Sequence, residues 1–209
     1  MINWLARLTG ETQARLLALL RRSRQTITSL AEALGLTDNA VRMHIAALHR
    51  DGIVEQVGTQ RDTGGKPARL YGLTREGEEL FPKAYALVLG KLVEAIVSSE
   101  GRARAIELLR TVGAQAGAGA RDGASRKQRV EAAAGVFRSL GTDVEVEKTG
   151  DGWRLQGHGC PLSAVTSGHA EVCELGKALV EEVVGTPVTE RCVRGEHPRC
   201  GFDVPTAME

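Results

Sequence analysis

LAEALGLTDNAVRMHIAALHRDGIV, residues 30–54, holds the pattern of two short helices joined by a tight corner. Thr28 precedes the first helix as an N-cap, and Gly35 supplies the left-handed residue that ends it. Thr37 then caps the second helix. The inward positions of the first helix are Leu30, Ala31 and Leu34. Two helices in this arrangement predict a helix-turn-helix.

The second helix of the pair presents a narrow, largely polar face. Its apolar residues repeat at helical spacing and are expected to face the core: Val41, Ile45 and Leu48. The second helix of a helix-turn-helix lies in the major groove and presents its N-terminal residues to base edges. The residues from which we predict DNA contacts are Thr37, Asn39, Arg42 and Met43. The alternative is a surface helix of an ordinary bundle.

A turn-rich stretch follows, GIVEQVGTQRDTGGKPARLYGLT at 52–74. Apolar and polar residues alternate on both sides of it, which predicts a β-hairpin with strands 53–58 and 68–73 and RDTGGK at its tip. Its basic residues are Arg61, Lys66 and Arg69. A basic hairpin placed after a recognition helix is typical of a wing, whose cations contact the DNA backbone and make binding salt-dependent.

The charge of the chain is unevenly distributed. Residues 1–76 hold 11 Lys and Arg against 7 Asp and Glu, a net charge of +4, and the rest of the chain has −3. The segment 11–22, ETQARLLALLRR, predicts a helix with basic residues in its last turn. A basic N-terminal third is compatible with a double-stranded DNA partner.

Composition and the N-terminus indicate the class of protein. Apolar residues make up 42% of the 209 residues and aromatics 3%, which suits helices packed on helices or on a small sheet. Charges at Arg7, Glu11 and Arg15 interrupt the first twenty residues, where a secretory leader would be apolar, so we expect a cytoplasmic protein. The most apolar later run, 84–97, is too short to cross a membrane and contains Lys91.

The segment after the wing predicts a helical connector. REGEELFPKAYALVLGKLVEAIVSS, residues 75–99, follows Thr74 as a cap, and Pro82 is expected to start or kink the helix. Its apolar residues at helical spacing are Leu80, Tyr85, Val88, Leu92, Ile96 and Val97. Because winged-helix repressors bind two-fold operators, this stripe predicts a homodimer interface. The alternative is a stripe that packs within the monomer.

The C-terminal part predicts a small α+β domain with an antiparallel sheet. The expected elements are helices at 101–118, 129–141 and 171–185 and strands at 143–148, 153–158, 187–193 and 200–204. The chain as a whole is therefore predicted to be α+β, divided into a DNA-binding domain at 1–76, a connector and dimerisation region at 77–122 and a cysteine-containing domain at 123–209. The sequence has no nucleotide-binding motif and no H-E-x-x-H, so we expect no enzyme activity.

All four cysteines lie in the last fifty residues, at Cys160, Cys173, Cys192 and Cys200. In a reducing compartment such a set favours metal, cluster or redox chemistry over structural disulfides. The alternatives are buried apolar packing, a disulfide switch and a zinc site, although the C-x2-4-C pairs typical of structural zinc are absent. An iron-sulfur cluster accepts thiolates from well-separated points of the chain.

Two resemblances to known families extend these expectations. LAEALGLTDNAVRMHIAALHRDGIV and GGKPARLYGLT resemble the winged helix-turn-helix of bacterial ArsR- and DeoR-like transcriptional regulators over about residues 10–76. GCPLSAVTSGHAEVCELGKALVEEVVGTPVTERC followed by CGFDV is similar to the C-terminal sensor domain of SufR-type repressors. Those repressors bind an oxygen-sensitive 4Fe-4S cluster and control genes for iron-sulfur cluster assembly.

The second resemblance implies a ligand set. It makes Cys160, Cys173, Cys192 and Cys200 the cluster ligands, with zinc as the alternative metal. The interval of twelve residues between the first two cysteines matches the family pattern, and the later intervals of eighteen and seven residues differ from it. Neighbouring candidates for a non-cysteine ligand are His158, His169, His197, Glu171 and Glu174. The alternative of a different class is an iron-sulfur, zinc or thiol enzyme that uses a winged helix for protein contacts.

Overall fold

The computed structural model describes residues 3–61, 67–121 and 125–206. The chain forms two compact units, Met1–Lys83 and Ala84–Glu209. The first is helical with a two-stranded hairpin, and the second combines helices with a four-stranded antiparallel sheet, so the predicted α+β class is confirmed. None of the helices within the described ranges is long and apolar enough to span a bilayer.

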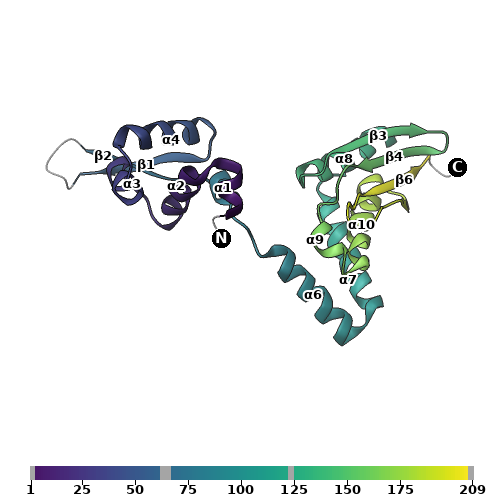
Figure 1. Cartoon of the computed structure of the whole chain (residues 1–209). Coiled ribbons are helices and arrows are strands. Elements are labelled where there is room, and N and C mark those ends of the chain that lie inside the picture. The colour runs from purple at the N-terminus through teal and green to yellow at the C-terminus, as the bar shows by residue number, and fades with distance from the viewer. Residues whose placement is uncertain (1–2, 62–66, 122–124, 207–209) are drawn as a thin grey trace. The chain divides into compact units, whose positions relative to one another are not determined.

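The N-terminal unit packs short helices against the base of a hairpin (Figure 1). Its elements are α1 (Asn3–Thr9), α2 (Glu11–Arg22), α3 (Ile27–Leu34), α4 (Asp38–Arg50), β1 (Val54–Gln60), β2 (Ala68–Leu73) and α5 (Arg75–Glu79). One apolar core joins them, and Leu16, Leu17, Leu30 and Val41 are completely buried in it. The predicted apolar faces of α3 and α4 are the faces that the structure buries.

The ends of α3 and α4 follow the expected capping chemistry, with one correction. Gly35 ends α3 with φ 68°, and the Thr37 hydroxyl accepts a hydrogen bond from the Ala40 N–H at 3.2 Å. The N-cap of α3 is Thr26, whose hydroxyl accepts from the Ser29 N–H at 3.1 Å; the predicted cap, Thr28, lies inside the helix. The Thr28 hydroxyl donates instead to the Asp38 carboxylate at 3.1 Å and so ties α3 to the start of α4.

The predicted helix over residues 75–99 is divided in two. The first part, α5, ends at Glu79, and α6 begins at Tyr85. The cause is local, because Pro82 lacks an N–H and Phe81 turns into the N-terminal core, where it is 8% exposed. The Arg21 guanidinium lies 4.3 Å from the centre of the Phe81 ring and covers it.

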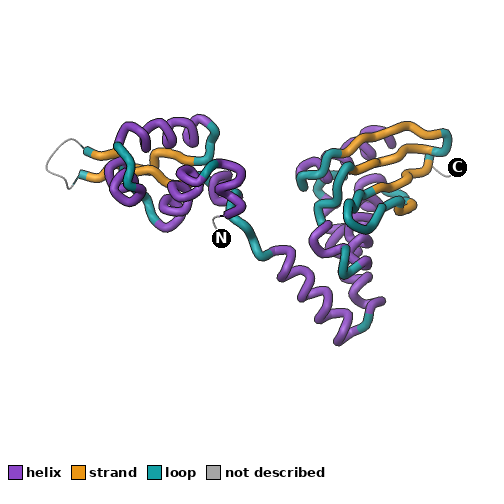
Figure 2. Tube along the Cα trace, viewed as in Figure 1, coloured by secondary structure: helices purple, strands orange, loops and turns teal. Residues whose placement is uncertain are grey.

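The C-terminal unit lays helices on one antiparallel sheet (Figure 2). Its elements are α6 (Tyr85–Glu100), α7 (Arg102–Ala118), α8 (Arg126–Ser139), β3 (Val144–Thr149), β4 (Gly152–Gly157), α9 (Ser163–Thr166), the 3₁₀ helix η1 (Ala170–Val172), α10 (Cys173–Val184), β5 (Thr189–Glu190) and β6 (Gly201–Pro205). The strand order is β3-β4-β6-β5. Helices α8 and α10 share one core with the sheet, where the rings of Phe137 and Phe202 lie 5.8 Å apart.

Candidate DNA-binding surface and cysteine site

The N-terminal half of α4 presents the polar face expected of a recognition helix. Thr37, Asn39 and Arg42 are exposed, and Met43 is 71% exposed, which is unusual for so apolar a side chain. Arg42 lies 4.0 Å from Asp38 one turn earlier, an exposed pair that leaves the guanidinium free to reorient. These side chains therefore lie exposed at the N-terminal half of α4.

The hairpin extends from this helix as a wing. Strands β1 and β2 pair antiparallel, and Arg69 lies opposite Thr59 in the register. Arg61 and Arg69 are exposed, and Lys66 lies outside the described residues. A backbone pair between Gln25 and Tyr71, with N to O distances of 3.0 and 2.8 Å, fixes the hairpin to the segment before α3.

A recess of about 280 Å³ lies between α4 and the hairpin. Arg42 and Arg69 line it from opposite sides, together with His49, Gln56 and Tyr71. The sequence pattern indicated the two arginines as DNA contacts but did not indicate the other three residues. Only the register of the hairpin against α4 brings them to this surface.

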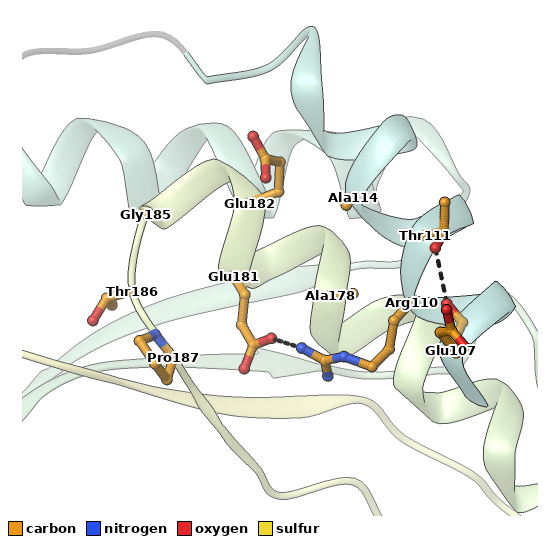
Figure 3. Close-up of a pocket in the computed structure, with 10 residues that line it drawn as sticks. All are labelled: Glu107, Arg110, Thr111, Ala114, Ala178, Glu181, Glu182, Gly185, Thr186 and Pro187. Atoms are coloured by element: carbon orange, nitrogen blue, oxygen red, sulfur yellow. Dashed lines mark hydrogen bonds and ion pairs between the residues drawn. The ribbon is translucent and has the colours of Figure 1, made fainter. Parts of the chain in front are cut away.

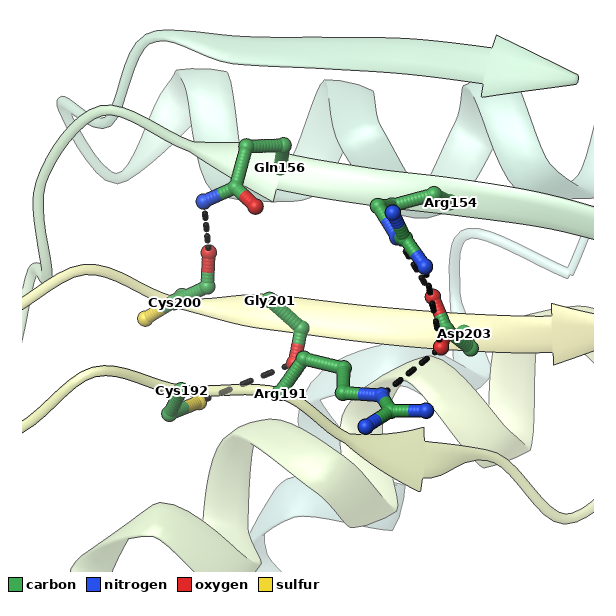
Figure 4. A network of polar contacts seen from close by, with 7 residues as sticks. All are labelled: Arg154, Gln156, Arg191, Cys192, Cys200, Gly201 and Asp203. Atoms are coloured by element: carbon green, nitrogen blue, oxygen red, sulfur yellow. Dashed lines mark hydrogen bonds and ion pairs between the residues drawn. The ribbon is translucent and has the colours of Figure 1, made fainter. Parts of the chain in front are cut away.

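The four cysteines come from four separate segments of the C-terminal unit. Cys160 follows β4, Cys173 begins α10, Cys192 follows β5 and Cys200 precedes β6. All four are free thiols, and all are partly buried. Figure 4 shows Cys192 and Cys200 side by side on neighbouring chain segments at one end of the sheet, where the Cys192 thiol donates to the Gly201 carbonyl at 3.8 Å.

The thiols lie close enough to change one another's ionisation. The Cys200 thiol is the main reason that the pKa of Cys160 falls to about 6. The Cys173 thiol is the main cause, followed by Cys200, of the lowered pKa of Cys192. The pKa values of Cys173 and Cys200 are raised in turn by their thiol neighbours, Cys192 and Cys160 respectively. The order of neighbours is therefore 160, 200, 192 and 173, and we call this set the cysteine quartet.

Groups around the quartet stabilise negative charge on its sulfur atoms. The backbone of Leu162 and the Thr166 hydroxyl both act to lower the pKa of Cys160. On the other side, the pKa of Arg194 is raised chiefly by Cys173, which reflects a cation held beside the thiols. Hydrogen bonds and a cation of this kind stabilise thiolates, the form in which cysteine binds metals.

The quartet offers sulfur donors, which zinc and iron-sulfur clusters both accept as ligands. Within the described part of the chain, no three His, Cys, Asp or Glu side chains converge closely enough to hold a single metal ion. The four thiols come from separate segments and influence one another's ionisation, which makes the quartet the candidate ligand set of this unit.

Four of the five candidates for a non-cysteine ligand have other partners. Glu171 is 8% exposed, lies 3.3 Å from His169 Nδ1 and pairs with Arg102 at 3.3 Å. Glu174 accepts a hydrogen bond from Arg110, and His158 lies 3.4 Å from Glu145. His197 is exposed and has no ion pair within the described residues.

Helix α10, which begins at Cys173, is held tightly by α7. Arg110 of α7 donates to Glu174 at 2.8 Å and to Glu181 at 2.5 Å, so one guanidinium links two turns of α10. Figure 3 shows the Arg110–Glu181 pair at a surface pocket of about 580 Å³ between these helices. The start of α10, at the quartet, and helix α7 therefore pack together as one unit.

Comparisons with known proteins identify the N-terminal domain. Residues 10–56 match the family model described as "Bacterial regulatory protein, arsR family". No curated protein sequence matches the chain. Two solved variants of Lactococcus lactis ZitR, one of them in its apo form, are 21% and 20% identical and cover 42% and 46% of this chain and 72% and 86% of their own, with a TM-score of 0.27 for each.

The family match covers the helix-turn-helix and the start of the wing. It assigns to residues 10–56 the DNA-binding domain of an ArsR-family transcriptional regulator, a kind of domain that is typically non-enzymatic. The predicted helix-turn-helix is thereby confirmed, and the C-terminal unit lies outside the match.

Proposed function

We propose that this ArsR-type regulator is a homodimeric repressor whose affinity for its DNA operator is controlled by an iron-sulfur cluster, a 4Fe-4S cluster, held by the cysteine quartet. The observation that carries the proposal is the meeting of four thiols, from Cys160 to Cys200, at one end of the sheet in a chain that also has a recognition helix. When bound, such a cluster supplies a site that oxygen can destroy.

The four cysteines would hold the cluster as thiolates. The neighbouring Cys200 thiol lowers the pKa of Cys160 to about 6, which favours the thiolate, the form that binds a metal. Arg194 would balance part of the negative charge of four thiolates. Zinc is the second candidate, supported by the same thiols, although the sequence lacks the C-x2-4-C pairs typical of structural zinc sites.

Helix α10 would transmit the state of the quartet. Cys173 is its first residue, and Arg110 of α7 donates a hydrogen bond to the next residue, Glu174. Without a bound group the first turn of α10 loses one anchor, and a shift there displaces α7 against α6. A coupling of about 1 to 3 kcal/mol between two sites is enough for a working switch.

Helix α6 would form the dimer interface. One side of this helix packs inside the C-terminal unit through Leu89, Val93 and Val97. Three further apolar residues at helical spacing are exposed: Tyr85 is 73%, Val88 53% and Leu92 55% exposed. We call these three residues the α6 stripe. An exposed apolar stripe of this kind is typical of a protein interface, and a second copy would bury it.

The DNA contacts would divide between the helix and the wing. Residues proposed to contact base edges in the major groove are Thr37, Asn39, Arg42 and Met43. Residues proposed to hold the DNA backbone are Arg61, Lys66 and Arg69. Two recognition helices in a dimer would then read two half-sites.

The first experiment is metal analysis of protein purified without oxygen. We expect iron and acid-labile sulfide in similar amounts, with a broad visible band from thiolate-to-iron charge transfer that bleaches in air. Serine at each of the four cysteine positions should reduce the iron content. Stoichiometric zinc in a colourless protein, or four titratable thiols with no metal, would eliminate the cluster.

A second experiment tests the DNA-binding half independently. Arg42→Ala should weaken binding to a duplex operator by about 1 to 3 kcal/mol, because a base-edge contact is lost. Arg7→Ala, which removes an exposed arginine from α1, is the matched control and should bind as the unmodified chain does. Equal losses in the two variants would mean that α4 contributes only general positive charge.

A further inference from the structure

A pocket of about 370 Å³ opens beside one member of the quartet, Cys160. Three separate segments build its walls: the α8–β3 turn at Thr142, the loop after β4 from His158 to Ser163, and the β5–β6 loop at 196–199. The lining is mainly polar, with His158, His197 and Arg199 among its side chains. Its volume is roughly twelve times the space that one water molecule occupies in the liquid.

Backbone hydrogen bonds join the three walls to one another. The His158 N–H donates to the Asp143 carbonyl at 2.8 Å, and the Cys200 N–H donates to the Gly159 carbonyl at 3.1 Å. Val193 and Arg199 exchange two further bonds, at 2.8 and 2.9 Å, across the β5–β6 loop. These bonds therefore hold the main chain of the three walls in place.

The quartet has two unlike sides. Cys160 lies in the wall of this pocket, whereas Cys192 and Cys200 pack against the hydrophobic core of the C-terminal unit. A solute that approaches from the pocket reaches the Cys160 sulfur first. Cys192 and Cys200 are partly buried against that core, so side chains packed on them restrict the approach of a solute.

We propose that this pocket is the entrance through which small polar solutes reach the quartet, and that Cys160 is the thiol they meet first. The proposal rests on the function proposed above and adds the side from which solutes reach the quartet. It depends only on this chain's own residues and can be measured on the metal-free protein.

The test is competitive labelling of the reduced, metal-free full chain under anaerobic conditions. Iodoacetamide and a bulky maleimide are each added below stoichiometry, and the labelled peptides are quantified by mass spectrometry. Cys160 should react about tenfold faster than Cys192 and Cys200 with the bulky maleimide, because it lines the pocket whereas they pack against the core. The ratio should grow with the bulk of the reagent, which separates access from differences in thiol ionisation.

A pocket-filling variant makes the test specific. A Cβ at Gly159 meets no atom within 4 Å, so Gly159→Met is expected to fold and to place its side chain at the pocket. It should slow the labelling of Cys160 by the bulky maleimide and leave Cys173 unchanged. Gly150→Met, the same substitution at an open position of the β3–β4 turn, is the control.

Two results would overturn the proposal. One is faster labelling of Cys192 or Cys200 than of Cys160 with the bulky reagent. The other is an unchanged Cys160 rate in a correctly folded Gly159→Met protein. Neither result bears on cluster binding, because no metal is present in the assay, and a failure to load iron would leave the labelling result intact.

Discussion

Gly113 on α7 lies so close to the backbone carbonyl of Leu175 on α10 that a Cβ at position 113 would be 2.1 Å from that oxygen. Only glycine permits this approach of two helices. The contact lies two residues after the start of α10 at Cys173, so the packing of α7 decides where the first turn of α10 can be.

Gly113→Ala should therefore lower the free energy of unfolding. A main-chain oxygen cannot rotate away from a new methyl group, so the two helices must separate, at a cost of about 1 to 3 kcal/mol. Urea unfolding followed by circular dichroism measures the loss. Gly135→Ala on α8, where a Cβ meets nothing within 4 Å, should instead be neutral or stabilising by up to about 1 kcal/mol. If both variants behave alike, the close α7–α10 contact has no energetic importance.

Asp203 predicts a dependence of stability on pH. Its carboxylate accepts hydrogen bonds from Arg154 at 2.7 Å and from Arg191 at 2.8 Å, as Figure 4 shows, and these partners, Arg154 first, hold its pKa below the usual value. A lowered pKa in the folded state stabilises the fold above the unfolded-state value of about 3.9, and this stabilisation is lost as the pH falls through the folded-state value.

Asp203→Asn should accordingly destabilise the protein by about 1 kcal/mol at pH 7, since both arginines lose a charged acceptor. The difference from the unmodified chain should shrink as the pH is lowered towards 3. Urea midpoints at several pH values test this expectation, with Asp151→Asn in the exposed β3–β4 turn as the control. A difference that stays constant with pH would mean that Asp203 acts through its shape and not through its charge.

The α6 stripe predicts a charge-sensitive dimer. Leu92→Glu places a carboxylate in the proposed interface, where an unpaired charge is costly to bury. We expect the variant to sediment as a monomer and to lose most of its operator affinity. Ser98→Glu adds the same charge on the polar side of α6 and should remain dimeric. A Leu92→Glu protein that still sediments as a dimer would place the interface elsewhere.

Local signals allowed much of the N-terminal unit to be predicted. The apolar spacing of α4, the positive φ at Gly35 and the cap at Thr37 all act over a few residues, and α2 has the bounds that its leucine pattern predicts. A start or kink was also expected at Pro82, and α6 begins three residues after it, at Tyr85. The sequence did not reveal α1, which is anchored by the 2% exposed Leu5 and has no capping pattern.

The spatial arrangement of the quartet could not be predicted from the sequence alone. Clustering of the cysteines in the last quarter of the chain indicated a shared site, but their order in space follows from the crossed strand order β3-β4-β6-β5. That order places β6 next to β4 and brings Cys200 beside Cys160, forty residues earlier. The pocket at Cys160 requires three loops to meet, which no local pattern encodes.

The most direct test of the whole account is the operator affinity of the cluster-loaded protein compared with that of the metal-free protein, at one fixed salt concentration and without oxygen. The operator can be selected from a random duplex library with the full chain. We predict a difference of roughly 5-fold to 150-fold between the two forms, and we expect it to disappear in Cys173→Ser. Equal affinities in a protein that demonstrably carries the cluster would contradict the account, because the quartet would then have no control over DNA binding.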